Sequence, residues 1–299
     1  MSAIELVLCP VDFTEPSRRE LRWAVQIASP FGAKLVLHHN LAASPLGLSR
    51  GWEWDQLHQA GYVGEDEAET RLQALCGEVP EGIAVEAVVT HGPVGAVLIE
   101  MVQRLPADLV VLGHHGLRDP DHASVTERLI EHGQCPILML PPSTTADGFR
   151  RDDATARILV PTDLSDAAVE VMAYAAELAR RVALQLHVVH VAPRGTRDAA
   201  LEMMQATLRS AVPADLREAA LIEVERGDPV PTILAAADRI DAAFLVMGEH
   251  ARGLLSRLFR SDTAHSVLER SARPVWYVPH HCLAPRLARS ASGATGQAD

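Results

Sequence analysis

The chain has 299 residues, a formal net charge of −12, 48% hydrophobic residues and 22% charged residues. This length favours two domains of roughly 100–200 residues each, and the composition is ordinary for a globular protein. The negative charge disfavours nucleic-acid binding, because it repels the phosphate backbone. No apolar stretch approaches the roughly 18 residues that a membrane span needs, so we expect no membrane contact.

The N-terminus enters the strand-like segment IELVLCPV directly, without a basic region, so no signal peptide is predicted. The cysteines are dispersed and form no C-x-x-C pair; they are Cys9, Cys76, Cys135 and Cys282. This usage is typical of reduced, structural thiols. We therefore expect a cytoplasmic protein.

The first half alternates short apolar runs with longer amphipathic ones. We predict strands at 4–11, 34–39, 83–90, 108–112 and 136–140. The first helix is expected to begin at Thr14 as N-cap, with Pro16 in its first turn. This alternation is the signature of βαβ units and a parallel sheet.

The second half repeats the first. Residues 8–40 resemble residues 159–191, and residues 89–116 resemble residues 224–251. Strands are predicted at 157–162, 184–191, 219–225, 243–247 and 274–278. A repeat of this length indicates two duplicated domains, 1–141 and 157–280, joined by a polar linker, 142–156, and followed by a disordered tail, 281–299.

The last strand of each half, PILML and PVWYV, is short and apolar. An exposed apolar edge strand tends to associate with another strand. We therefore predict that the two halves pair these edges in an internal pseudo-dimer. The sequence leaves open whether two such chains associate further into a homodimer.

Polar residues collect where the strands of each half end. The first copy has Asp12 after its first strand, and the second has Asp163 at the same place. In open parallel sheets, ligands bind outside the carboxyl ends of the strands. The sequence therefore predicts a small-molecule site at this edge of each half.

These segments resemble the universal stress protein family, as a tandem member. The matching features are PVDFTEPS and PTDLSDAA, DLVVLGHHG and AFLVMGEHA, and the endings SVTERLIEHGQCPILML and TAHSVLERSARPVWYVP, in the same order in both copies. The resemblance implies an α/β fold of two Rossmann-like doubly wound domains, each a five-stranded parallel sheet flanked by helices. It also implies a stress-linked binding and regulatory role without defined catalysis, and that some members bind ATP through a G-x2-G-x9-G-[S/T/N] loop.

The resemblance places candidate nucleotide-binding residues in both copies. They are Pro10, Val11, Asp12, Gly113, Gly116 and Ser124 in the first, and Pro161, Thr162, Asp163, Val191, Gly248, Ala251, Ser261 and Asp262 in the second. Backbone N–H groups of such a loop cradle phosphates. Neither copy matches fully: the first loop is short and acidic, with Asp119 and Asp121, whereas the second carries Arg252, Arg257 and Arg260. ATP or a related adenine nucleotide is therefore the expected ligand, more credibly in the second copy.

Histidines gather at the strand ends of the first copy. They are His38, His39, His91, His114 and His115, close to Asp12 in the inferred topology. Imidazole and carboxylate from separate elements are typical ligands of transition metals, so a divalent metal is a second hypothesis. The alternative is that these residues are half-buried polar strand ends. The insertion 41–62, with Trp52, Trp54, His58 and Tyr62, has no counterpart in the second copy; it is a lid over the site, simple packing, or a dimer contact.

No phosphate loop with G-K-[S/T], no G-x-S-x-G turn and no nucleophile beside a base is found in the sequence. We therefore expect a binding protein and not an enzyme. Two alternatives stay open. One is a metal- or nucleotide-dependent hydrolase that uses the His and Asp of the first copy, and the other is a structural interaction protein with empty pockets.

Overall fold

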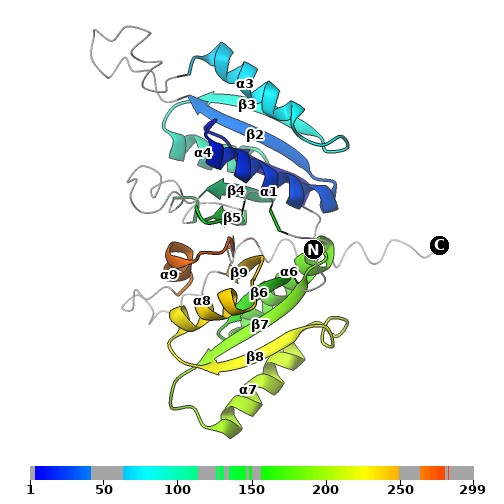
Figure 1. The fold of residues 1–299 in the computed structure, drawn as a ribbon, viewed down its shortest axis with the longest axis vertical. Helices are drawn as coiled ribbons and strands as arrows, with labels where there is room; N and C mark the ends of the chain where they lie inside the picture. Colours follow the sequence, from blue (N-terminus) through cyan, green and yellow to red (C-terminus); the bar gives the residue numbers. More distant parts are fainter. Residues whose placement is uncertain are drawn as a thin grey trace, which may run out of the picture.

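The structure is a computed structural model that describes residues 4–41, 63–113, 126, 128–130, 135–145, 148–149, 156–248, 263–279 and 282. The two halves of the chain lie one above the other along the long axis of the molecule (Figure 1). Of the predicted tail, only Cys282 is described, and it is buried. The insertion 41–62 lies outside the described residues apart from Leu41.

Each half contributes five parallel strands. The first half contains β1 (Leu6–Pro10), β2 (Lys34–Leu41), β3 (Val85–His91), β4 (Leu109–Gly113) and β5 (Ile137–Leu140), and the second contains β6 (Arg157–Thr162), β7 (Gln185–Ala192), β8 (Leu221–Arg226), β9 (Phe244–Gly248) and β10 (Val275–Val278). Every predicted strand is present, with bounds within two residues of those observed. The central strands of each half are covered by helices on both faces, which is why they appear in the sequence as continuous apolar runs.

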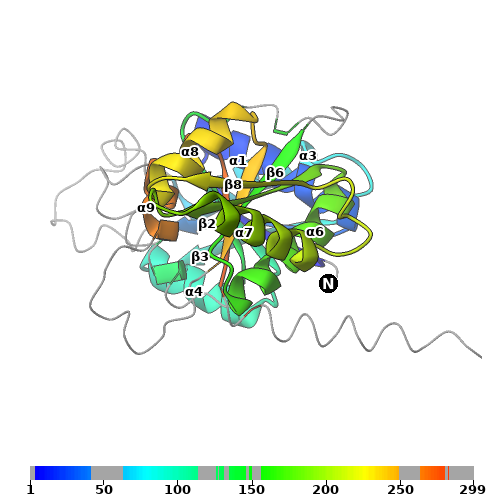
Figure 2. The same ribbon diagram turned by 90° about the horizontal axis from the view of Figure 1, so that it is seen from below.

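Helices cover both faces of the sheet (Figure 2). One face carries α1 (Glu15–Phe31), α3 (Glu65–Gly77), α6 (Asp166–Val182) and α7 (Asp198–Ala211), and the other carries α4 (Val94–Arg104), α8 (Pro229–Arg239) and α9 (Thr263–Arg270). The α1 helix has Thr14 at its N-cap position and a proline in its first turn, as predicted. The predicted α/β class, with two Rossmann-like halves, is therefore confirmed.

The two halves form one sheet of ten strands, in the order β3-β2-β1-β4-β5-β10-β9-β6-β7-β8. The β5 and β10 strands pair antiparallel, with Leu138 opposite Trp276. The predicted internal pseudo-dimer through the last strands is thus confirmed. Each half keeps the same internal order, read outward from this junction.

In the described part of the segment predicted as a linker, Phe149 packs against both halves. Phe149 is 5% exposed, and its ring lies 5.5 Å from Trp23 of the first half and 5.8 Å from Phe244 of the second. Its backbone N–H donates to Gln26 of α1 at 2.9 Å. The connection therefore contributes to the core at the junction.

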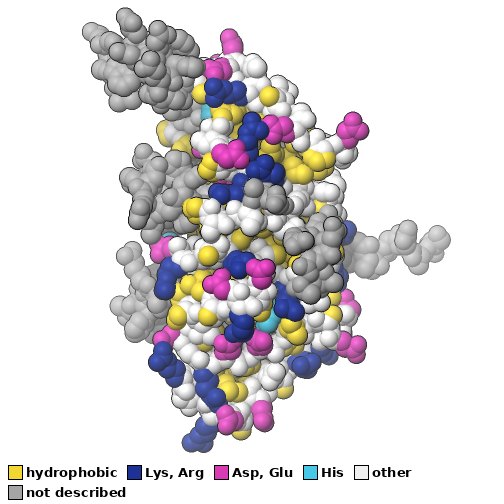
Figure 3. Space-filling view, viewed as in Figure 1, with side chains coloured by type: hydrophobic (Ala, Val, Ile, Leu, Met, Phe, Trp, Pro, Cys, Tyr) yellow, Lys and Arg dark blue, Asp and Glu magenta, His cyan; other side chains and the backbone are white. Residues whose placement is uncertain are grey.

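Charges of both signs are interspersed on the face shown in Figure 3, without a continuous basic patch. Among the described residues, no helix is long and apolar enough to cross a membrane.

Candidate functional site

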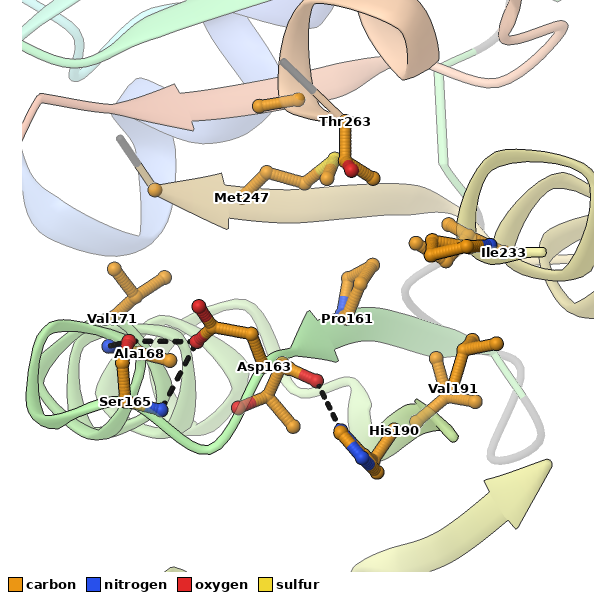
Figure 4. A pocket seen from close by; sticks show the side chains of 15 residues that line it. Pro161, Asp163, Ser165, Ala168, Val171, His190, Val191, Ile233, Met247 and Thr263 are labelled. Atoms are coloured by element: carbon orange, nitrogen blue, oxygen red, sulfur yellow. Dashed lines mark hydrogen bonds between the residues drawn. The ribbon is translucent and has the colours of Figure 1, made fainter. Parts of the chain in front are cut away.

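In the second half, a pocket of about 140 Å³ lies at the carboxyl ends of the parallel strands. It is lined by Pro161, Thr162, Asp163, Ser165, Ala168, Val171, Val189, His190, Val191, Pro229, Ile233, Met247, Gly248, Thr263 and Ala264 (Figure 4). The β6 and β9 strands are neighbours here, while the chain leaves β6 for β7 on its other side. The pocket therefore opens at the topological switch point, where ligands bind in open α/β sheets.

The turn between β6 and α6 holds Asp163 in place. Asp163 accepts hydrogen bonds from the backbone N–H of Ser165 at 3.0 Å and from its hydroxyl at 2.6 Å. The Ser165 hydroxyl in turn accepts from the Ala168 N–H at 3.2 Å and caps α6. Between them, Leu164 has a left-handed backbone, with φ of 68°. Such strain is costly for a bulky residue and is typical of functional turns.

His190 fixes the opposite side of the same turn. Its Nδ1 donates to the carbonyl of Thr162 at 2.8 Å, which links the end of β7 to the end of β6 (Figure 4). The other walls are mostly apolar side chains from both faces of the sheet, namely Val171, Val189, Val191, Ile233 and Met247. A mostly apolar pocket with one carboxylate in its lining suits a small organic ligand that combines an apolar ring with hydrogen-bond donors.

The first half builds the same turn. Asp12 accepts from the N–H of Thr14 at 2.9 Å and from its hydroxyl at 2.5 Å. Phe13 is left-handed, with φ of 64°. His39 Nδ1 donates to the Val11 carbonyl at 2.7 Å, as His190 does in the second half. Duplication therefore preserved the backbone of the site in both halves.

The predicted nucleotide-binding residues fall into three groups. Pro161, Thr162, Asp163, Val191 and Gly248 all line the pocket of the second half. Pro10, Val11, Asp12 and Gly113 hold the corresponding strand ends of the first half. Gly116, Ser124, Ala251, Ser261 and Asp262 lie outside the described residues.

The three described histidines of the predicted cluster each contact a different protein group. His38 Nε2 lies 2.6 Å from the hydroxyl of Thr90, and burial lowers the pKa of His38 to about 4. His39 contacts the Val11 carbonyl, and His91 Nε2 lies 3.2 Å from Glu65 Oε1.

The described part of the chain contains no group of three or more His, Cys, Asp or Glu side chains arranged to hold a metal ion. His114 and His115 lie outside it. The metal hypothesis therefore stays a prediction.

Several pocket residues were not expected from the sequence. Val171 and Ala168 come from α6, Ile233 from α8 and Met247 from the interior of β9. In the sequence they are ordinary apolar core positions. A difference between the copies was visible for Val171 and Ala168, which align with the polar residues Glu20 and Ser17 when the two copies are superposed at Asp12 and Asp163.

The fold and the turns define a class of protein: two doubly wound α/β halves, each with a polar, strained turn after its first strand. The profile of the Universal stress protein family matches the chain twice, over residues 4–141 and 155–279. The chain therefore belongs to the universal stress protein family, with two copies of the family's domain in tandem.

Relatives agree with this assignment. Universal stress protein MJ0531 of Methanocaldococcus jannaschii is 24% identical over 138 residues, which cover 45% of this chain and 80% of the relative. Universal stress protein Sll1654 of Synechocystis is 25% identical over 140 residues, covering 45% and 84%. The crystal structure of a universal stress protein from Archaeoglobus fulgidus has a TM-score of 0.65 at 20% identity, covers 93% of this chain and 97% of its own, and shares the fold.

Proposed function

We propose that this tandem universal stress protein binds an adenine nucleotide in its second half and acts by binding and regulation in a stress response. The observation that carries the proposal is the pocket at the switch point of β6 and β9, with Asp163 at its mouth and apolar walls behind it. The alternatives, a hydrolase or an interaction protein without a small ligand, are outcomes of the test.

Each part of the pocket matches a part of the ligand. The walls formed by Val189, Val191 and Ile233 suit the faces of a purine ring. The Asp163 carboxylate lies where it would accept hydrogen bonds from ribose hydroxyls, and such charge-assisted bonds are strong. Thr263 and Ala264, at the described start of α9, also line the pocket. The positive end of a helix favours a phosphate.

The first prediction tests Asp163. Isothermal titration of ATP into the full chain should give measurable binding, and Asp163→Asn should weaken it roughly ten- to a hundredfold, because a charged acceptor is lost. Asn keeps an oxygen that accepts from Ser165, so the turn is retained. Asp12→Asn, at the equivalent turn of the first half, is the matched control and should bind as the wild type does.

No heat with millimolar ATP would contradict the proposal. A loss confined to Asp12→Asn would move the site to the first half. Incubation with ATP and Mg²⁺, followed by chromatography, tests the alternative activity: release of ADP or AMP that Asp12→Asn abolishes would favour the hydrolase.

A further inference from the structure

The two halves differ at one buried position of the site. The α1 and α6 helices each have 17 residues and begin immediately after Thr14 and Ser165. Counted from these residues, Glu20 of α1 occupies the place of Val171 of α6. Val171 lines the pocket of the second half, so a carboxyl stands at the corresponding point of the first half.

Glu20 reaches the same strand end as Val171. A Cβ added to Gly248, the last residue of β9, would collide with a methyl group of Val171. Glu20 accepts a hydrogen bond from the backbone of Gly113, the last residue of β4. Both side chains therefore fill the space between the first helix and the end of the fourth strand of their half.

The carboxyl of Glu20 is incompletely satisfied. Glu20 is 4% exposed, and its Oε1 has no hydrogen-bond partner among the described residues. Burial, with the negative charge of Asp12 next, raises the pKa of Glu20 to about 8, against smaller opposing effects of Arg19 and the Gly113 backbone. At neutral pH the group is mostly a neutral acid, and above pH 8 it adds a negative charge beside Asp12.

Three other apolar wall positions of the second half are polar in the first. The strand register is the same in both halves, because His38 lies opposite Pro10 as Val189 lies opposite Pro161. The pocket-lining residues Val189 and Val191 therefore correspond to His38 and Asn40 of the first half. By the same correspondence, Ser17 replaces Ala168. These three have protein partners, since Ser17 donates to Thr14, His38 contacts Thr90, and Asn40 donates to Gly92.

We propose that Glu20 decides which half takes the nucleotide: its buried carboxyl excludes an adenine nucleotide from the first half, where Val171 admits one in the second. The proposal rests on the proposed function above. A purine in the first half would lie against this carboxyl where Val171 offers an apolar wall, and the carboxyl would lose its remaining access to water. That loss costs about 1–3 kcal/mol, or roughly ten- to a hundredfold in affinity. The ligand's phosphates would also approach Asp12 and, at high pH, an ionised Glu20.

Exchange of the two residues is the test. Equilibrium dialysis of the full-length protein with ATP should count one site per chain in the wild type and two in Glu20→Val. It should count none in Val171→Glu and one again in the double variant. Glu15→Val, at an exposed position of α1, and Val169→Glu, at an exposed position of α6, are matched controls and should keep one site. The unfolding midpoint of each variant verifies that it is folded.

The outcomes separate the two proposals. No site in the wild type would remove the proposed function itself. Two sites in the wild type would leave that function standing and overturn the role of Glu20. One site in the wild type and still one in Glu20→Val would overturn it as well, and this arm does not depend on whether Val171→Glu folds.

Discussion

At the scale of the residue, burial changes the titration of a histidine in the first half. His38 is 1% exposed, and its environment, desolvation first and the neighbouring His39 second, lowers its pKa to about 4. The folded protein therefore keeps this imidazole neutral. An unfolded chain has no such restraint, and its histidines take up a proton near pH 6.5.

This difference predicts acid sensitivity. As pH falls from 7 to 5, His38 becomes protonated in the unfolded state but stays neutral in the folded state. Protonation therefore stabilises the unfolded state, and the free energy of unfolding should decrease by about 2 kcal/mol through this residue. His38→Gln removes this contribution, and its urea midpoint should depend less on pH than that of the wild type. Equal slopes for wild type and His38→Gln would refute the assignment.

At the scale of the element, α1 and α6 are matched helices that end differently. Gly32 follows α1 with φ of 62°, and Ala183 follows α6 with φ of 58°. Both backbone N–H groups return to carbonyls of the last helical turn. Only glycine adopts this left-handed conformation without a steric cost from Cβ.

These two C-cap positions predict that exchanging glycine and alanine will change the free energy of unfolding in opposite directions. Ala183→Gly should raise the free energy of unfolding by about 0.5–1 kcal/mol, because it relieves the left-handed strain. Gly32→Ala should lower it by a similar amount, although an added Cβ meets no atom within 4 Å. Thermal and urea unfolding measure both. A destabilised Ala183→Gly would mean that the C-cap geometry is wrong.

At the scale of the whole molecule, the junction between the halves combines a strand pair with an aromatic row. The β5 and β10 strands join the two halves of the sheet. Next to them lies a row of aromatic rings in tilted or edge-to-face contact, with neighbouring ring centroids 5.5–5.8 Å apart: Trp23, Phe149, Phe244 and Trp276. Phe149 comes from the connecting segment and touches both halves. The connection is therefore part of what holds the halves together.

Removal of this ring should weaken the whole chain. Phe149→Ala should reduce the free energy of unfolding by about 3–5 kcal/mol, as expected for an aromatic side chain removed from a core. Phe149→Leu keeps most of the apolar volume and should cost less than about 2 kcal/mol. Urea unfolding followed by circular dichroism measures both. A change in Phe149→Ala below that of the leucine variant would show that the junction does not depend on this ring.

The sequence by itself determined the elements and their duplication. Hydrophobic periodicity depends on local spacing, so the ten strands, the matched first helices and the two short apolar edges could all be predicted. The carboxyl-end position of Asp163 followed as well, because parallel βαβ units place all such ends at one edge. The loop residues of the two nucleotide motifs could be proposed only through the family resemblance; they are Gly116 and Ser124 in the first half and Ala251, Ser261 and Asp262 in the second.

Tertiary structure alone decided which distant side chains meet. Ile233 and Met247 are core residues by pattern and became pocket walls only because α8 packs on β7 and β9 lies beside β6. Phe149 lies in a segment whose polar composition predicted a linker, yet its side chain is buried between Trp23 and Phe244. In the sequence Glu20 is one of many charged helix residues, and only the packing of α1 against the end of β4 shows that it is buried. Periodicity records which face of an element is apolar, but burial of one polar group depends on packing between elements far apart in the chain.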